Sequence, residues 1–157
     1  MKTLPMTNLK LFQQYQAKKH PLLKSEQLLT GSGWIKNNRD NGSIGFIELN
    51  DGTTYKNIQL VYGLNTKQYE MVSHLRIGAA ISYLGVLKYT PEAKQPFEIH
   101  VSDVMLLGDS DEDYPMQKKR HSYEFLRDFA HLRMRTNTFN ALFRVRSVLA
   151  TGFQEFF

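Results

Sequence analysis

The sequence contains no cysteine, which excludes disulfide bonds, thiolate nucleophiles and cysteine-ligated zinc or iron–sulfur sites. It also lacks any apolar run close to the roughly 20 residues that a membrane-spanning helix needs. The first ten residues contain neither the apolar segment nor the cleavage site of a secretory signal. We therefore expect a cytoplasmic protein with no membrane partner.

Catalytic motifs are equally scarce. The five histidines never fall at the spacing of a zinc motif, so we predict no metal site. Gly31-Ser32-Gly33 precedes a predicted strand, so it cannot present helix N-terminal amides to a phosphate as a P-loop does. A nucleophile motif of the G-x-S-x-G type is also absent. We expect no catalytic residue and no bound cofactor in these 157 residues.

The charge is positive and unevenly distributed. Lysine and arginine number 20 against 15 acidic residues, and the net charge of +5 attracts polyanions without identifying one. An acidic run at 109–113 is followed by eight basic residues between Lys118 and Arg146. Such a run is typical of a solvated helix face as well as of a nucleic-acid contact.

Residues 28–107 have the alternating pattern of a β-domain. The predicted strands are Leu28–Lys36, Ser43–Leu49, Lys56–Tyr62, Ala79–Lys88 and Phe97–Met105. Asn41-Gly42 and Asp51-Gly52 supply the positive φ of tight turns, so the first three strands should form a meander. A helix is predicted at Asn65–Arg76, after the third strand. This order predicts a five-stranded OB-fold barrel with an inserted helix, and it disfavours an SH3-like barrel.

Helices are predicted on both sides of the barrel, so the fold class is mainly β with C-terminal helices. Asn8 can cap a helix that ends at His20-Pro21, and further helices should cover Ser122–Leu132 and the region after a Thr138 cap. We expect an N-terminal helical extension at 1–27, the OB domain at 28–107, a linker at 108–121 and a C-terminal helical region at 122–157. An apolar stripe on the last helix should pack against a sheet or a second subunit; it consists of Phe139, Leu142, Val145, Leu149, Phe153 and Phe156.

Alternation in the second strand defines a candidate binding surface. If Ile47 and Leu49 fill the barrel, Phe46 and Glu48 point outward, and Gln59 shares their face. Arg39 and Lys36, near the first turn, add positive charge. An aromatic ring, an amide and cations are what the reading of an unstacked RNA base requires. A register slipped by one residue would instead bury Phe46, and the pattern alone leaves both alternatives open.

Three segments resemble asparaginyl-tRNA synthetases. Residues 113–138, Asp-Tyr-Pro-Met-Gln-Lys-Lys-Arg-His-Ser-Tyr-Glu-Phe-Leu-Arg-Asp-Phe-Ala-His-Leu-Arg-Met-Arg-Thr-Asn-Thr, resemble the hinge region of that family. Upstream, Gly33-Trp34-Ile35 with the residues around Phe46-Ile47 is similar to the anticodon-binding OB domain of class IIb synthetases. Downstream, 139–157 is similar to the opening of motif 1, which implies the first helices of a class II catalytic domain and a homodimer interface.

The resemblance implies roles for individual residues. Phe46 would stack on the central uridine of the anticodon, Gln59 would hydrogen-bond an anticodon base, and Arg39 would contact the anticodon loop. Asn37 and Asn38 stand where relatives often have arginine, and Lys36 and Lys56 would partly replace that charge. Glu48 completes the predicted RNA-binding set. The implied partner is the anticodon stem-loop of a tRNA, with no DNA expected.

The family's reaction uses ATP and Mg²⁺ to activate asparagine and transfers it to tRNA. Its motifs 2 and 3 are absent here and the match breaks off within motif 1, so we predict no aminoacylation by these 157 residues alone. One alternative is a standalone OB module that binds single-stranded RNA. Another is an interaction protein that pairs through the stripe of the last helix.

Overall fold

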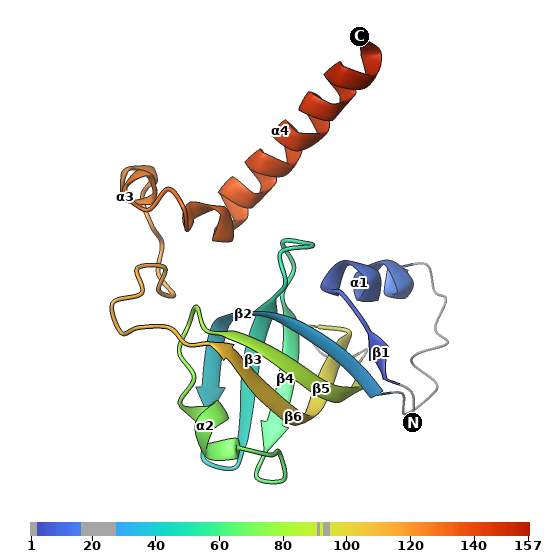
Figure 1. The fold of residues 1–157 in the computed structure, drawn as a ribbon. Helices are drawn as coiled ribbons and strands as arrows, with labels where there is room; N and C mark the ends of the chain where they lie inside the picture. Colours follow the sequence, from blue (N-terminus) through green and yellow to red (C-terminus); the bar gives the residue numbers. More distant parts are fainter. Residues whose placement is uncertain (1–2, 17–27, 91, 93–94) are drawn as a thin grey trace. The chain divides into compact units, whose positions relative to one another are not determined.

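Alternating apolar residues build a six-stranded sheet of order β1-β2-β3-β4-β6-β5, in which β2 also pairs with β5 (Figure 1). The computed structural model describes residues 3–16, 28–90, 92 and 95–157. The strands are β1 Leu4–Pro5, β2 Leu28–Asp40, β3 Ile44–Asn50, β4 Ile58–Gly63, β5 Ala80–Tyr89 and β6 Phe97–Gly108. Because β2 pairs on both sides, β2 to β6 close into a five-stranded barrel, which confirms the predicted OB-fold.

The inner face of the barrel is filled by aliphatic side chains. Ile47, Leu49, Ile58 and Leu60 each have a relative exposure of 0%. Burying one such side chain contributes about 1.5–3 kcal/mol. Barrel closure depends on the parallel pairing of β4 with β6, where Leu60 stands opposite Ile99. The strand β1 went unpredicted because it is only two residues long and lies parallel to β2.

Strand β2 is longer than the sequence pattern indicated. It runs to Asp40, so Arg39 is a strand residue and not part of the first turn. A bulge between Ile35 and Asn37 shifts the register of β2 against β3. The turns that follow β2 and β3 contain Gly42 at φ 88° and Gly52 at φ 77°, which confirms the positive φ expected of both glycines.

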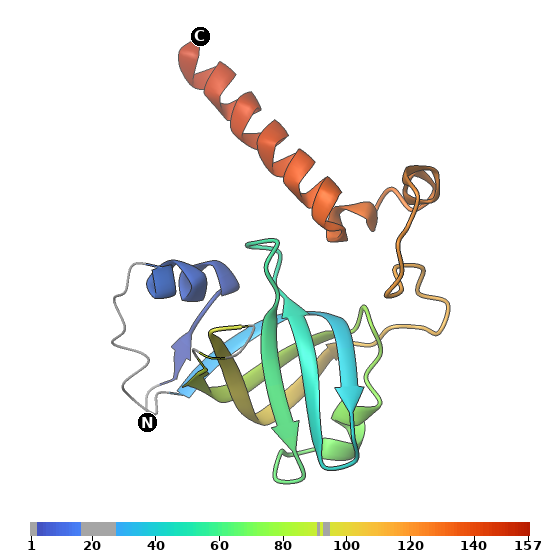
Figure 2. The same ribbon diagram turned by 180° about the vertical axis from the view of Figure 1, so that it is seen from behind.

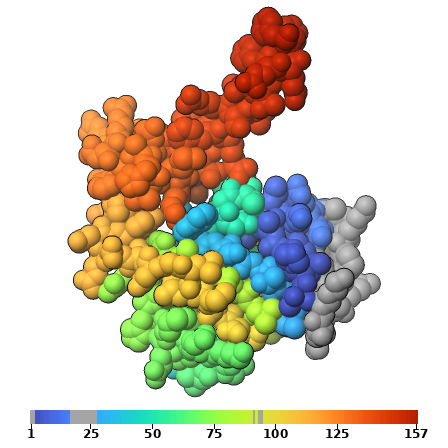
Figure 3. All heavy atoms as spheres, viewed as in Figure 1, coloured from blue at the N-terminus to red at the C-terminus, as the bar shows by residue number. Residues whose placement is uncertain are grey.

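Helix α1, Asn8–Gln16, is fastened to the end of the barrel by Asn8. This residue is 2% exposed, and its Nδ2 donates to the carbonyl of Leu49 at 3.2 Å. The prediction of Asn8 as the cap was wrong, since Thr7 Oγ1 accepts the N–H of Lys10 at 3.4 Å. The atoms of α1 lie against the β3–β4 loop (Figure 3), where the Leu9 N–H donates to Thr53. The predicted end at His20-Pro21 lies outside the described residues.

The inserted helix α2 covers Tyr69–Ser73 and is shorter than predicted. Gln68 has a left-handed backbone with φ 58°, which prevents an earlier helix start. Before it, the buried hydroxyl of Thr66 donates to the carbonyl of Val101 at 3.1 Å and accepts the N–H of Gly63 at 3.0 Å. These tertiary bonds hold residues 63–66 in a turn, a competition that helical periodicity does not reveal.

Residues from Pro115 to Phe157 form a compact unit separate from Met1–Tyr114. The unit contains α3 Tyr123–Asp128, the 3₁₀ turn η2 Arg133–Arg135 and α4 Asn137–Phe156. Helix α3 is shorter than predicted because the backbone of Phe129 leaves the helical region, with ψ 52°. Helix α4 begins two residues earlier than predicted, because its cap is Thr136 and not Thr138. Among the described helices, none is long and apolar enough to cross a lipid bilayer.

Candidate nucleic-acid interface

Strands β2, β3 and β4 lie side by side in Figure 2, and the predicted aromatic residue, Phe46, belongs to the middle one. On β3, Ile47 and Leu49 are buried inside the barrel, whereas Phe46 and Glu48 are partly exposed on the opposite face. The outward orientation of Phe46 is therefore confirmed, and the register slipped by one residue is wrong. On β4, Gln59 is likewise partly exposed between the buried Ile58 and Leu60.

Arg39 and Phe46 are cross-strand neighbours. They stand opposite each other in the β2–β3 ladder, and the Arg39 Cζ atom lies 6.0 Å from the centroid of the Phe46 ring. A hollow of about 400 Å³ opens beside this pair. It is lined by Arg39, Asp40, Asn41, Ile44, Phe46 and Gln59. The structure thus places three of the predicted site residues around one depression that is large enough for a base.

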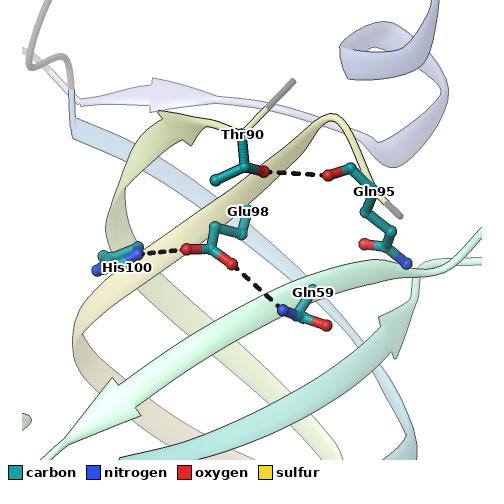
Figure 4. Close-up of polar contacts among 5 residues, drawn as sticks. All are labelled: Gln59, Thr90, Gln95, Glu98 and His100. Atoms are coloured by element: carbon teal, nitrogen blue, oxygen red, sulfur yellow. Dashed lines mark hydrogen bonds and ion pairs between the residues drawn. The ribbon is translucent and has the colours of Figure 1, made fainter. Parts of the chain in front are cut away.

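Gln59 is held by a neighbour that the sequence analysis did not identify. Its Nε2 donates to Glu98 Oε2 at 3.2 Å, and the other carboxylate oxygen of Glu98 lies 2.7 Å from His100 Nε2 (Figure 4). Glu98 and His100 come from β6, which runs parallel to β4. Their separation by two residues in a strand puts both on one face. The sequence shows the two-residue spacing of Glu98 and His100, but only the pairing of β4 with β6 connects these two residues to Gln59.

Glu48 lies between two asparagine side chains. Its Oε1 accepts from Asn37 Nδ2 and its Oε2 accepts from Asn57 Nδ2, each at 3.3 Å. Glu48 is also the cross-strand partner of Gln59. The two amides fix the carboxylate on the outer face, where it can accept hydrogen bonds from a base. Asn37 therefore has a local role, which is to orient the Glu48 carboxylate.

Asp40 brings a negative charge to the rim of the hollow. The backbone N–H of Gly42 donates to Asp40 Oδ1, and the hydroxyl of Tyr69 donates to the same oxygen at 2.9 Å. These two hydrogen bonds, that from Gly42 foremost, lower the pKa of Asp40 below its ordinary value. The carboxylate is therefore ionised at neutral pH and joins the β2–β3 turn to α2.

The two predicted lysines lie apart from the hollow. Lys36 occupies the bulge of β2, and Lys56 belongs to the β3–β4 loop, where its Nζ lies 4.9 Å from the centroid of the Phe12 ring. Neither lysine is among the six residues that line the hollow. The structure therefore does not bring these two lysines together with Arg39, Phe46 and Gln59.

The predicted interface residues of α4 differ in exposure. Leu142, Val145, Leu149, Phe153 and Phe156 are between 57% and 82% exposed. Phe139 is half-buried, because Arg133 Cζ lies 5.1 Å from its ring centroid and Tyr123 makes an edge contact at 6.1 Å. A hollow of about 850 Å³ in the same unit is lined by residues between Lys119 and Thr138.

Comparison with known proteins agrees with this geometry. Residues 30–107 match the family described as OB-fold nucleic acid binding domain. The asparagine-tRNA ligase of Acholeplasma laidlawii is 50% identical over 140 residues, which cover 88% of this chain and 30% of that protein. That of Clostridium beijerinckii is 50% identical over 129 residues, covering 82% and 28%. The chain therefore spans about 30% of the length of these curated relatives.

Solved structures share the fold. Asparaginyl-tRNA synthetase from Pyrococcus horikoshii has a TM-score of 0.71 at 24% identity, over 84% of this chain and 32% of that one. Aspartyl-tRNA synthetase from Entamoeba histolytica has a TM-score of 0.70 at 18% identity, over 89% and 36%. Together with the sequence matches, these findings identify the chain as a homologue of asparagine-tRNA ligases over most of its length, whose residues 30–107 belong to the family of OB-fold nucleic acid binding domains.

Proposed function

We propose that the outer face of β2, β3 and β4 binds the anticodon loop of an asparagine-accepting tRNA. The observation that carries this proposal is the half-exposed ring of Phe46 in a hollow shared with Arg39 and Gln59. A base can stack on Phe46 while Arg39 attracts the phosphates and Gln59 hydrogen-bonds the base edge. A tRNA partner places this activity in the cytoplasm, where translation takes place.

The expected affinity is modest. Stacking of a base on an aromatic side chain contributes about 1–3 kcal/mol, so one ring needs phosphate contacts beside it. The net charge of +5 supplies a sequence-independent attraction. Asp40 and Glu48 oppose the phosphates but offer acceptors to base donors, so they favour base reading over backbone binding. The surface is therefore suited to discrimination between loops more than to tight binding.

The remaining steps of the family's reaction extend the proposal. Activation of asparagine with ATP and Mg²⁺, followed by transfer to tRNA, would use the parts of the relatives that these residues do not match. The described residues contain no cluster of three or more histidine and acidic side chains able to hold a metal ion. The exposed apolar stripe of α4 supports a further role, contact with a second copy of the enzyme in a homodimer.

A standalone module that binds single-stranded RNA is the second candidate. The closed barrel with its own buried core favours it, because such a domain can fold and bind alone. The two candidates differ in selectivity. An anticodon reader should prefer a stem-loop with uridine at the central anticodon position, whereas a general binder should treat unrelated single strands alike.

Replacement of Phe46 tests the proposal directly. We expect Phe46→Ala to weaken binding of the anticodon stem-loop about 5- to 150-fold, the equivalent of one lost stack. Tyr55→Ala is the matched control, since Tyr55 is an aromatic residue, 59% exposed, on the β3–β4 loop. Fluorescence anisotropy against salt concentration should give a slope of about 0.7 per neutralised phosphate. Equal affinity of the Phe46→Ala variant and the unmodified chain would contradict the anticodon assignment.

A further inference from the structure

His100 stands at the end of a hydrogen-bonded chain that leads to the hollow. Its Nε2 lies 2.7 Å from Glu98 Oε1, and Glu98 Oε2 accepts from Gln59 Nε2 at 3.2 Å (Figure 4). Each carboxylate oxygen thus has its own partner. The Glu98 side chain is 19% exposed and that of His100 is 42% exposed. The carboxylate is therefore largely shielded, and His100 is the member of the chain most open to solvent.

The chain fixes which end of the Gln59 amide remains available. An ionised carboxylate can only accept hydrogen bonds, so the group of Gln59 that faces Glu98 must be the NH₂ group. The carbonyl oxygen of Gln59 then points away from Glu98, as Figure 4 shows. An acceptor at this position suits uracil or guanine, which carry an N–H inside the Watson–Crick edge. Cytosine and adenine have a nitrogen lone pair in place of this N–H, so they cannot donate from that position.

The same reasoning sets the protonation of His100. Because Glu98 accepts, Nε2 of His100 must carry a hydrogen, which both the neutral ring and the imidazolium can supply. Because the acceptor is an ionised carboxylate, this hydrogen bond is charge-assisted in either form of the ring. Without His100, Glu98 Oε1 would lose this donor and the carboxylate could rotate away from Gln59.

The strands on either side leave Glu98 as the close charged neighbour of His100. In the ladder, Val61 of β4 and Val86 of β5 stand beside His100, and both are apolar. Lys88 of β5, the cross-strand partner of Glu98, brings a positive charge to the same face. On β4 the nearest polar side chain of the chain is Gln59, which is uncharged. His100 therefore acts on the chain through its bond with Glu98.

We propose that His100 is a positioning residue, which holds Glu98 so that Gln59 presents its carbonyl oxygen to the base in the hollow. This proposal rests on the proposed anticodon binding and adds a residue that controls selectivity without touching RNA. Removal of the His100 N–H donor is therefore expected to weaken base discrimination without removing any group that contacts the base.

The test compares two stem-loops that differ only in uridine or cytidine at the central anticodon position. His100→Ala should reduce the ratio of their dissociation constants about fivefold, the value of one hydrogen bond. His100→Gln keeps an N–H donor at this position, so it should retain most of the discrimination. His131→Ala, at an exposed histidine of the other unit, should behave as the unmodified chain.

NMR spectra of the protein without RNA separate this proposal from the proposed function. The side-chain amide resonances of Gln59 should shift in His100→Ala and stay close to those of the unmodified chain in His100→Gln. If they do not move in His100→Ala, or if His100→Ala discriminates as well as the unmodified chain, the positioning role is wrong. If neither the unmodified chain nor any variant binds the stem-loop, while the Gln59 resonances respond to His100 as expected, anticodon binding is refuted. The positioning role of His100 is then unaffected.

Discussion

Two branched aliphatic residues, Ile47 in the barrel and Leu149 in α4, show how differently the two units of this chain use apolar surface. Both recur in a regular pattern, at period two in β3 and at helical spacing in α4. The relative exposure is 0% for Ile47 and 57% for Leu149. The barrel supplies the opposing strands that cover Ile47, whereas the described residues supply nothing that covers the stripe of α4. A periodic pattern therefore forms the element, and a second surface is needed to bury it.

The largest test of this comparison is truncation on each side. Ile47→Ala should destabilise the barrel by about 2–5 kcal/mol, because it removes buried methyl groups and leaves a cavity. Leu149→Ala should change the free energy of unfolding by less than about 0.5 kcal/mol. Urea unfolding followed by the fluorescence of Trp34, a residue of β2, measures the first effect, and far-UV circular dichroism, to which the long helix α4 contributes, measures the second. A large, concentration-dependent loss in Leu149→Ala would break the comparison, since it would mean that a second copy covers α4.

A middle-sized effect is expected at Asn38, which joins β2 to α2. Its Nδ2 donates to the carbonyls of Val72 and Leu75 at 2.8 and 3.1 Å, and its Oδ1 accepts from the Tyr62 hydroxyl at 2.9 Å. Asn38→Ala leaves these partners unsatisfied and should cost about 1–3 kcal/mol. Amide hydrogen exchange in α2 should accelerate. Asn65→Ala, at an exposed position, is the control, and equal stability of the two variants would contradict the role of Asn38.

The smallest expected effect concerns the start of α4. Thr136 Oγ1 accepts the N–H of Phe139, so Thr136→Ala should cost the helix about 1 kcal/mol. Thr138→Ala should cost much less, because Thr138 is already inside the helix. Circular dichroism and exchange rates of the first-turn amides measure the difference. The reverse order of effects would place the cap at Thr138. Because α4 is helical without being buried, this cap should matter more here than caps do in the barrel.

Sequence reasoning was most successful where a pattern is local. The five barrel strands and the two glycine turns follow from alternation and turn chemistry, both of which act over a few residues. Alternation left the orientation of Phe46 open, and the family resemblance favoured the outward one that the structure has. Sequence reasoning was least successful where distant groups compete. Thr66 bonds to Val101 and so shortens α2, and Asn8 bonds to Leu49 when a cap was expected. Periodicity carries no information about such partners.

The candidate site divides in the same way. Phe46, Arg39 and Gln59 come together as alternation and the resemblance led us to expect, whereas Lys56 packs on Phe12 instead. Glu98 and His100 could not be found from sequence because β4 and β6 are separated by more than thirty residues and their register is set only by barrel closure. Side chains that orient other side chains are the least visible class of residue in a pattern.

The bulge in β2 has a consequence for where Arg39 lies. Ile35 stands opposite the inward Leu49, and Asn37 stands opposite the outward Glu48, so the single residue Lys36 reverses which alternate positions face out. A regular strand with the same residues would pair Lys36 with Glu48, and it would turn Arg39 toward the barrel interior and Asn38 toward solvent. The extra residue is what keeps Arg39 on the outer face beside Phe46. The position of this cation therefore depends on an irregularity of the backbone and not on alternation along β2.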